Sequence, residues 1–191
     1  MNKLQMYIRD IWSSEIKKSY QQGIICSERH LQAEIYRHFK NHIDLKEYQM
    51  WVEPVIELFY SESENANYKP DLVISKDNDV ICFIEIKYVP YNYVDFLYDI
   101  EKLRVYQQLN SEKKFPLKTD PKTGNWSKER YSIVPNVLSV FAVIAKHDAW
   151  AHGPKNYFET ELEQSFPLAN FLVLKGKTNS ETIQFEAGKN N

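Results

Sequence analysis

Residues 68–87 decide the fold, and they read YKPDLVISKDNDVICFIEIK. Two apolar runs, 72–74 and 80–84, flank a cluster of turn-forming residues at 75–79, as in a β-hairpin. The second run is apolar at every position, which indicates a strand that is covered on both faces. The sequence therefore predicts a hairpin buried within a sheet.

Charged residues end the second apolar run. Because side chains alternate between the two faces of a strand, Glu85 and Lys87 should share the face of Ile81 and Phe83. An ion pair at the end of a buried strand is costly unless something compensates for the lost water. A bound divalent cation would be such a compensation.

The position of Asp71 relative to Glu85 depends on the length of the hairpin loop. A three-residue loop over 77–79 pairs Lys76 with Val80, and the same register places Asp71 opposite Glu85. Opposite residues share a face, with Cβ atoms about 4.5–5.5 Å apart. A two-residue loop would move Asp71 to the other face and remove the site. With the longer loop, two neighbouring carboxylates raise the pKa of at least one of them and offer oxygen ligands to a hard cation.

These residues carry a resemblance to a known family. Pro70-Asp71, followed by Glu85-Ile86-Lys87, resembles the motif of the PD-(D/E)xK nuclease superfamily, which has the restriction-endonuclease-like fold. The resemblance implies metal-dependent phosphodiester cleavage, with Mg²⁺ as the cofactor and Mn²⁺ able to replace it. Asp71 and Glu85 would bind the metal together with the backbone carbonyl of Ile86. Lys87 would orient or deprotonate the attacking water and offset phosphate charge.

A fourth candidate, Glu28, lies on a predicted helix upstream of the sheet. Ser27 is a suitable N-cap for a helix that runs to about Asn41. Helical spacing places Glu28 in the middle of the apolar stripe formed by Leu31, Ile35 and Phe39. Residues 27–31 resemble the helix that carries a glutamate in many relatives of the suspected family. Glu28 is predicted either as a site residue or as a carboxylate that interacts only with the helix dipole.

The rest of the chain fits a single α/β domain over residues 1–191. Hydrophobic periodicity predicts an N-terminal helix over 1–22, a strand at 52–60, a helix ending near 110, a strand at 137–145, a helix at 157–166, and strands at 171–174 and 183–185. The element order over 27–145 is similar to the αβββαβ core of the restriction-endonuclease-like fold, with a central mixed β-sheet flanked by helices. Residues 146–191 are a C-terminal elaboration, and 113–130 form a basic loop.

The amino-acid composition excludes few classes of function. The formal net charge of −2 argues against a broad basic surface for non-specific binding of nucleic acid, although a metal site adds negative charge of its own. Cys26 and Cys82 have no motif spacing and are expected to be reduced, as in a cytoplasmic protein. No apolar run is long enough to cross a membrane, so no membrane partner is expected.

Three hypotheses follow. The first is a nuclease that acts on DNA rather than RNA and forms a homodimer if it cuts both strands at one place. The second is a binding or structural module that keeps the same fold without the chemistry. In the third, the Asp, Glu and Lys triplet arises by chance, and Glu85 and Lys87 form only an ion pair.

Overall fold

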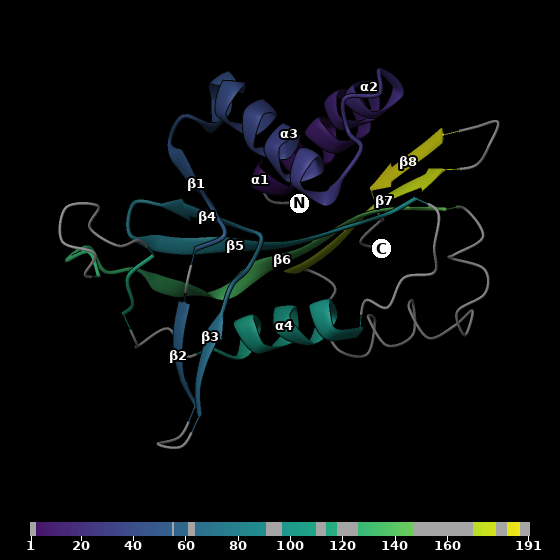
Figure 1. Cartoon of the computed structure of the whole chain (residues 1–191). Coiled ribbons are helices and arrows are strands. Elements are labelled where there is room, and N and C mark those ends of the chain that lie inside the picture. The colour runs from purple at the N-terminus through teal and green to yellow at the C-terminus, as the bar shows by residue number, and fades with distance from the viewer. Residues whose placement is uncertain are drawn as a thin grey trace.

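Helices and strands surround the central hairpin in a mixed α/β arrangement. The computed structural model describes residues 3–54, 56–60, 64–90, 97–109, 114–117, 126–146, 170–178 and 183–187. Six strands form one sheet, with α1, α2 and α3 over one face and α4 over the other (Figure 1). A separate ribbon of two strands projects on the side of α4 (Figure 1). The predicted α/β class is therefore confirmed.

The elements begin and end as follows. The helices are α1 (Lys3–Asp10), α2 (Lys17–Gln21), α3 (Glu28–Asn41) and α4 (Leu97–Gln108), with a π-helical segment at Ile11–Ile16 and a 3-10 turn at Ile43–Leu45. The strands are β1 (Tyr48–Val52), β2 (Ile56–Tyr60), β3 (Glu64–Tyr68), β4 (Leu72–Lys76), β5 (Asp79–Val89), β6 (Ser132–Lys146), β7 (Phe171–Thr178) and β8 (Ile183–Ala187). The predicted helix at 157–166 and most of the basic loop 113–130 lie outside the described residues.

The strand order explains why the hairpin is so apolar. The order is β1-β4-β5-β6-β7-β8, with β5–β6 and β6–β7 parallel and the other neighbours antiparallel. The chain passes from β5 to its parallel neighbour β6 by way of α4, which lies on one face of the sheet. β5 thus has a partner strand along both edges and helices over both faces, which favours apolar residues at nearly every position.

The turn between β4 and β5 is shorter than predicted. Lys76 pairs with Asp79, so the turn has two residues instead of the expected three. Asp77 adopts the left-handed conformation, with φ 55°, that such tight hairpin turns require. A bulge at Ile81 then adds one residue to β5.

This bulge preserves the register on which the site depends. Beyond the bulge Leu72 pairs with Ile84, which is the register expected from the three-residue loop. The two-residue turn alone would have shifted the pairing by one, and the extra residue in β5 cancels that shift. Asp71, one residue before β4, therefore approaches β5 beside Glu85.

Side chains of the hairpin divide between two apolar clusters. The cluster toward α1, α2 and α3 contains Leu72, Ile74, Cys82, Ile84 and Ile86. The cluster toward α4 contains Val73, Val80 and Phe83. Ile81 packs against the first cluster, so the expectation that it shares the face of Phe83 is wrong. The bulge is the physical reason, because it interrupts the alternation of faces at that residue.

The first strand of the sheet also differs from the prediction. The sheet contains Tyr48–Val52, whereas Ile56–Tyr60 pairs with Glu64–Tyr68 in the separate ribbon. Glu53 has φ 45°, and Pro54 follows it, so the chain leaves the sheet after Val52. The predicted strand at 52–60 thus spans the end of one strand, a break, and the whole of another.

Both helices predicted near the N-terminus are confirmed. Helical structure extends from Lys3 to Gln21, and Ser27 caps α3 by accepting a hydrogen bond from the His30 backbone N–H at 3.2 Å. Among the described residues, no helix is both long and apolar enough to cross a membrane.

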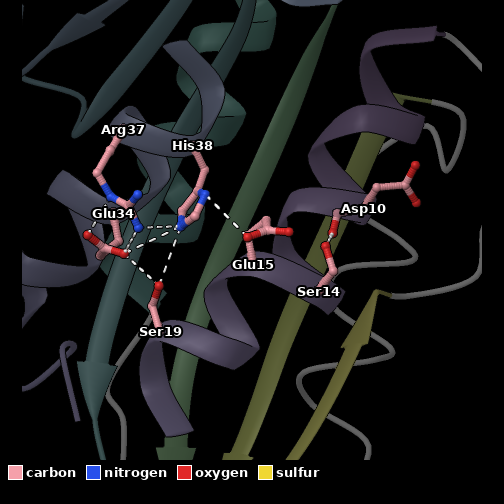
Figure 2. Close-up of polar contacts among 7 residues, drawn as sticks. All are labelled: Asp10, Ser14, Glu15, Ser19, Glu34, Arg37 and His38. Carbon is pink, nitrogen blue, oxygen red and sulfur yellow. Dashed lines mark hydrogen bonds and ion pairs between the residues drawn. The ribbon is translucent and has the colours of Figure 1, made fainter. Parts of the chain in front are cut away.

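A polar cluster joins α3 to the N-terminal helices (Figure 2). The Ser19 hydroxyl donates to Glu34 Oε2 at 2.6 Å, and Arg37 Nε and Nη2 donate to the same carboxylate at 2.9 and 2.7 Å. His38 Nδ1 lies 3.6 Å from Glu15 Oε2. Glu34 is therefore the buried carboxylate of α3, held by partners from two helices.

Candidate active site at the end of the central hairpin

Asp71 is anchored where the chain enters β4. The Ile86 backbone N–H donates to Asp71 Oδ2 at 2.6 Å, and Gln32 Nε2 donates to the Asp71 carbonyl at 2.9 Å. Burial raises the pKa of Asp71 to about 6, even though the Ile86 N–H and the Lys102 ammonium favour its charged form. The carboxylate is thus fixed against β5 in surroundings that disfavour an uncompensated negative charge.

Glu85 is the most deeply buried carboxylate of the site, with 1% of its surface exposed. Lys102 Nζ donates to Glu85 Oε2 at 2.5 Å, and the Tyr106 hydroxyl donates to Oε1 at 3.4 Å. Burial, together with the nearby charge of Asp71, raises the pKa of Glu85 to about 8. The charge of Asp71 therefore acts on Glu85, as expected for carboxylates on neighbouring strands.

Lys87 lies on the same face as Glu85 and reaches α4. Its Nζ is 2.8 Å from Asp99 Oδ2, and Asp99 is buried. Burial acts to lower the pKa of Lys87, but the hydrogen bond and charge of Asp99 raise it overall. The side chain is thus held in place by Asp99 while its ammonium stays partly open to solvent.

Glu28 lies at the rim of this group and not in the apolar stripe of α3. Its side chain is exposed, and Tyr88 N–H donates to its Oε2 at 3.4 Å. The prediction that Glu28 projects into the stripe is wrong, because the buried carboxylate of the helix is Glu34. The charge of Glu28 nevertheless acts on Asp71 and Lys87, which places it near both.

Sequence reasoning missed the part of the site that α4 contributes. Asp99 also lies 3.7 Å from Lys102 Nζ, one turn further along α4. The contacts of Lys102 and Tyr106 with Glu85 were not predicted. The sequence feature that could have indicated these contacts is the spacing of the polar residues at positions 99, 102 and 106. This spacing places all three on one face of a helix that covers a sheet.

The donor set fits a hard cation. Asp71, Glu85 and the Ile86 carbonyl offer oxygen atoms only, and Mg²⁺ is commonly held by one or two carboxylates with water and substrate phosphate completing its shell. Within the described ranges, no group of three or more His, Cys, Asp or Glu side chains could hold a metal ion by itself. Asp71 Oδ1 accepts none of the hydrogen bonds described above, and Lys102 is the cation that Mg²⁺ would have to replace at Glu85.

Comparison with known proteins adds no relative. No protein family matches the sequence, no curated protein is similar to it, and no solved structure matches its fold.

Proposed function

We propose that this protein is a metal-dependent nuclease of the PD-(D/E)xK type that hydrolyses phosphodiester bonds, in DNA rather than RNA. The observation that carries the proposal is the contact of Asp71 Oδ2 with the Ile86 N–H at 2.6 Å. This contact holds the Pro-Asp half of the motif against the Glu-x-Lys half, which lies 14 residues further along the chain at Glu85.

The topology supports the same proposal. Elements α3, β1, β4, β5, α4 and β6 follow one another in the order αβββαβ, which agrees with the core of the restriction-endonuclease-like fold. The β2–β3 ribbon is then an insertion between the first and second core strands, and β7 and β8 extend the sheet beyond β6. A fold alone does not assign an activity, so the proposal depends on the site.

Each residue has a role in this proposal. Asp71, Glu85 and the Ile86 carbonyl would hold Mg²⁺ or Mn²⁺. A bound divalent cation lowers the pKa of its water and stabilises charge on the phosphate. Lys87, held as an ammonium by Asp99, would orient the attacking water and offset phosphate charge, and its raised pKa argues against a role as the base. Glu28 supports the arrangement from the rim.

Lys102 has two partners in succession. Without metal, its ammonium lies 2.5 Å from Glu85 Oε2 and favours the charged form of that carboxyl against the effect of burial. If Glu85 held a cation, the Lys102 ammonium would be free to contact a substrate phosphate nearby. It would then contribute positive charge to binding of the substrate backbone.

The test is a double variant, Asp71→Ala with Lys87→Ala. We expect the wild-type protein to cleave DNA with Mg²⁺ or Mn²⁺, and the double variant to lose cleavage while keeping its thermal transition. The matched control replaces Glu47 and Lys76 by alanine, because these residues form an exposed ion pair of 2.9 Å at the other end of the hairpin. Undiminished cleavage by the Asp71 and Lys87 variant, or no cleavage of any nucleic acid by the wild type, contradicts the proposal.

A second candidate is a binding module without catalysis. The 2.5 Å contact of Lys102 with Glu85 favours it, because the carboxylate already has a cationic partner. This candidate predicts that titration calorimetry with Mn²⁺ shows no binding that depends on Asp71 or Glu85. Saturable binding that Asp71→Asn weakens selects the nuclease instead.

A further inference from the structure

Tyr98 is unusually open to solvent. It lies in the first turn of α4 with 72% of its surface exposed, the largest value among the exposed large hydrophobic side chains of the described residues. Its neighbour in sequence, Asp99, is buried and holds Lys87. The same helical turn therefore presents one side chain to the candidate site and an aromatic ring to solvent beside it.

Lys102 links this ring to the site. Its Nζ lies 5.7 Å from the centroid of the Tyr98 ring and 2.5 Å from Glu85 Oε2. The two residues are four apart in α4, so they are neighbours on one side of the helix. An ammonium that lies over an aromatic ring covers one face and leaves the other accessible. Only the Lys102 side chain thus separates the open ring from Glu85, the carboxylate proposed to bind the metal.

We propose that Tyr98 stacks on an unpaired base of the substrate, and that the substrate is single-stranded nucleic acid or a single-stranded end. The inference rests on the proposed function, because it places the scissile phosphate at Asp71 and Glu85. In a nucleotide whose phosphate is bound there, one sugar separates the base from the phosphate. The base can therefore reach an aromatic ring next to Lys102. Bases within a duplex are already stacked on both sides and offer no free face.

The charge of the chain points to the same substrate. Binding to duplex DNA depends on many contacts between basic residues and phosphates. This chain has a formal net charge of −2, with 24 Lys and Arg against 26 Asp and Glu, so a broad basic surface is not expected. Aromatic stacking supplies affinity for single strands without a large positive charge.

Tyr48 offers a control for the cation–ring contact, although Tyr48 is half-buried against the core and Tyr98 is open to solvent. Lys76 Nζ lies 5.7 Å from the centroid of the Tyr48 ring, which is the same distance as between Lys102 and Tyr98. Tyr48 pairs with Lys76 beside the hairpin turn, whereas Glu85 lies six residues beyond Asp79, or about 20 Å along an extended strand. Tyr48 thus has the same local contact far from the site.

The experiment measures fluorescence anisotropy of a labelled thymidine oligonucleotide, as a single strand and as a duplex, in Ca²⁺ and separately in EDTA. We expect the wild type to bind the single strand more tightly than the duplex. Tyr98→Ala should weaken single-strand binding at least about five-fold, because stacking of one base is worth about 1 kcal/mol or more. Tyr98→Trp should keep the single-strand affinity of the wild type, and Tyr48→Ala should leave that affinity unchanged. Gel analysis verifies that the oligonucleotide stays intact.

Two results overturn the inference: equal single-strand affinity of Tyr98→Ala and wild type, or tighter binding of the duplex by the wild type. Either result leaves the nuclease proposal intact if metal-dependent cleavage still requires Asp71 and Lys87. Conversely, a stacking effect of Tyr98 in a protein that cleaves nothing overturns the nuclease proposal alone. The two hypotheses therefore fail separately.

Discussion

Replacement of Glu34 by glutamine tests the electrostatic argument for the α3 cluster in Figure 2. The pKa of Glu34 is lowered from 4.5 to about 2, because hydrogen bonds from Arg37 outweigh the opposing effect of burial and Ser19 adds to them. At about 1.4 kcal/mol for each pH unit, this difference corresponds to about 3 kcal/mol of stability at neutral pH.

The expected loss of stability is smaller than this value because part of the Glu34–Arg37 interaction is exposed to solvent. The Glu34 side chain is only 11% exposed, but that of Arg37 is 49% exposed, so solvent screens part of the interaction. We therefore expect Glu34→Gln to lower the free energy of unfolding by about 1–3 kcal/mol. With a typical urea dependence of about 2 kcal/mol per molar, the midpoint should fall by about 0.5–1.5 M.

The dependence on pH has a definite sign. A carboxylate whose pKa is depressed in the folded state stabilises the protein above its unfolded pKa, and this contribution is lost as the pH falls through the folded pKa. The stability difference between wild type and Glu34→Gln should thus be complete above pH 4.5 and shrink as the pH approaches about 2. Urea unfolding followed by circular dichroism across this range measures it.

Glu101→Gln is the matched control, because Glu101 also pairs with an arginine three residues later, Arg104. This pair is exposed, and its replacement should change stability by less than about 0.5 kcal/mol. A Glu34→Gln effect that is absent at neutral pH, or that does not vary between pH 4.5 and about 2, refutes the reasoning.

Three further predictions concern stability without metal. Asp71→Asn should raise the unfolding free energy in EDTA at neutral pH by about 1–3 kcal/mol, because burial raises the pKa of Asp71 to about 6 and an amide avoids that cost; a lower urea midpoint would contradict this. Asp77→Val should cost about 1–2 kcal/mol, since φ is 55° there, whereas Asp77→Gly should cost nothing. Gly176→Ala should cost about 1 kcal/mol or more, because its Cβ would lie 2.9 Å from Ile144 Cγ1; an unchanged urea midpoint would show that Ile144 moves freely.

Much of the framework around the site followed from local pattern. The apolar run before Glu85 and the Ser27 cap each depend on neighbours in sequence, and each lies in the expected element, whereas the turn between β4 and β5 is one residue shorter than predicted. The first strand was misplaced because the left-handed φ of Glu53 has no clear sequence signal in a non-glycine residue.

Only part of the candidate site could be predicted from the sequence. Asp71 and Glu85 lie close together as the three-residue loop predicts, but the turn has two residues, and the bulge at Ile81, which the sequence reasoning did not predict, restores the register. Lys102 and Tyr106 reach Glu85 from a helix, and that contact depends on how α4 packs across the sheet. The burial of Glu34 likewise depends on the position of the N-terminal helices, which the periodicity of α3 alone does not determine.

The bulge at Ile81 limits how this hairpin can vary in length. Deleting that residue while keeping the short turn would slide one strand past the other by a single position and rotate Asp71 away from Glu85. Lengthening the turn by one residue would shift the pairing by one position in the other direction, and would also separate Asp71 from Glu85, unless the bulge disappeared at the same time. Insertions and deletions at these two places should therefore be tolerated only as compensating pairs, and a natural or engineered variant that changes one alone should keep its sheet but separate Asp71 from Glu85.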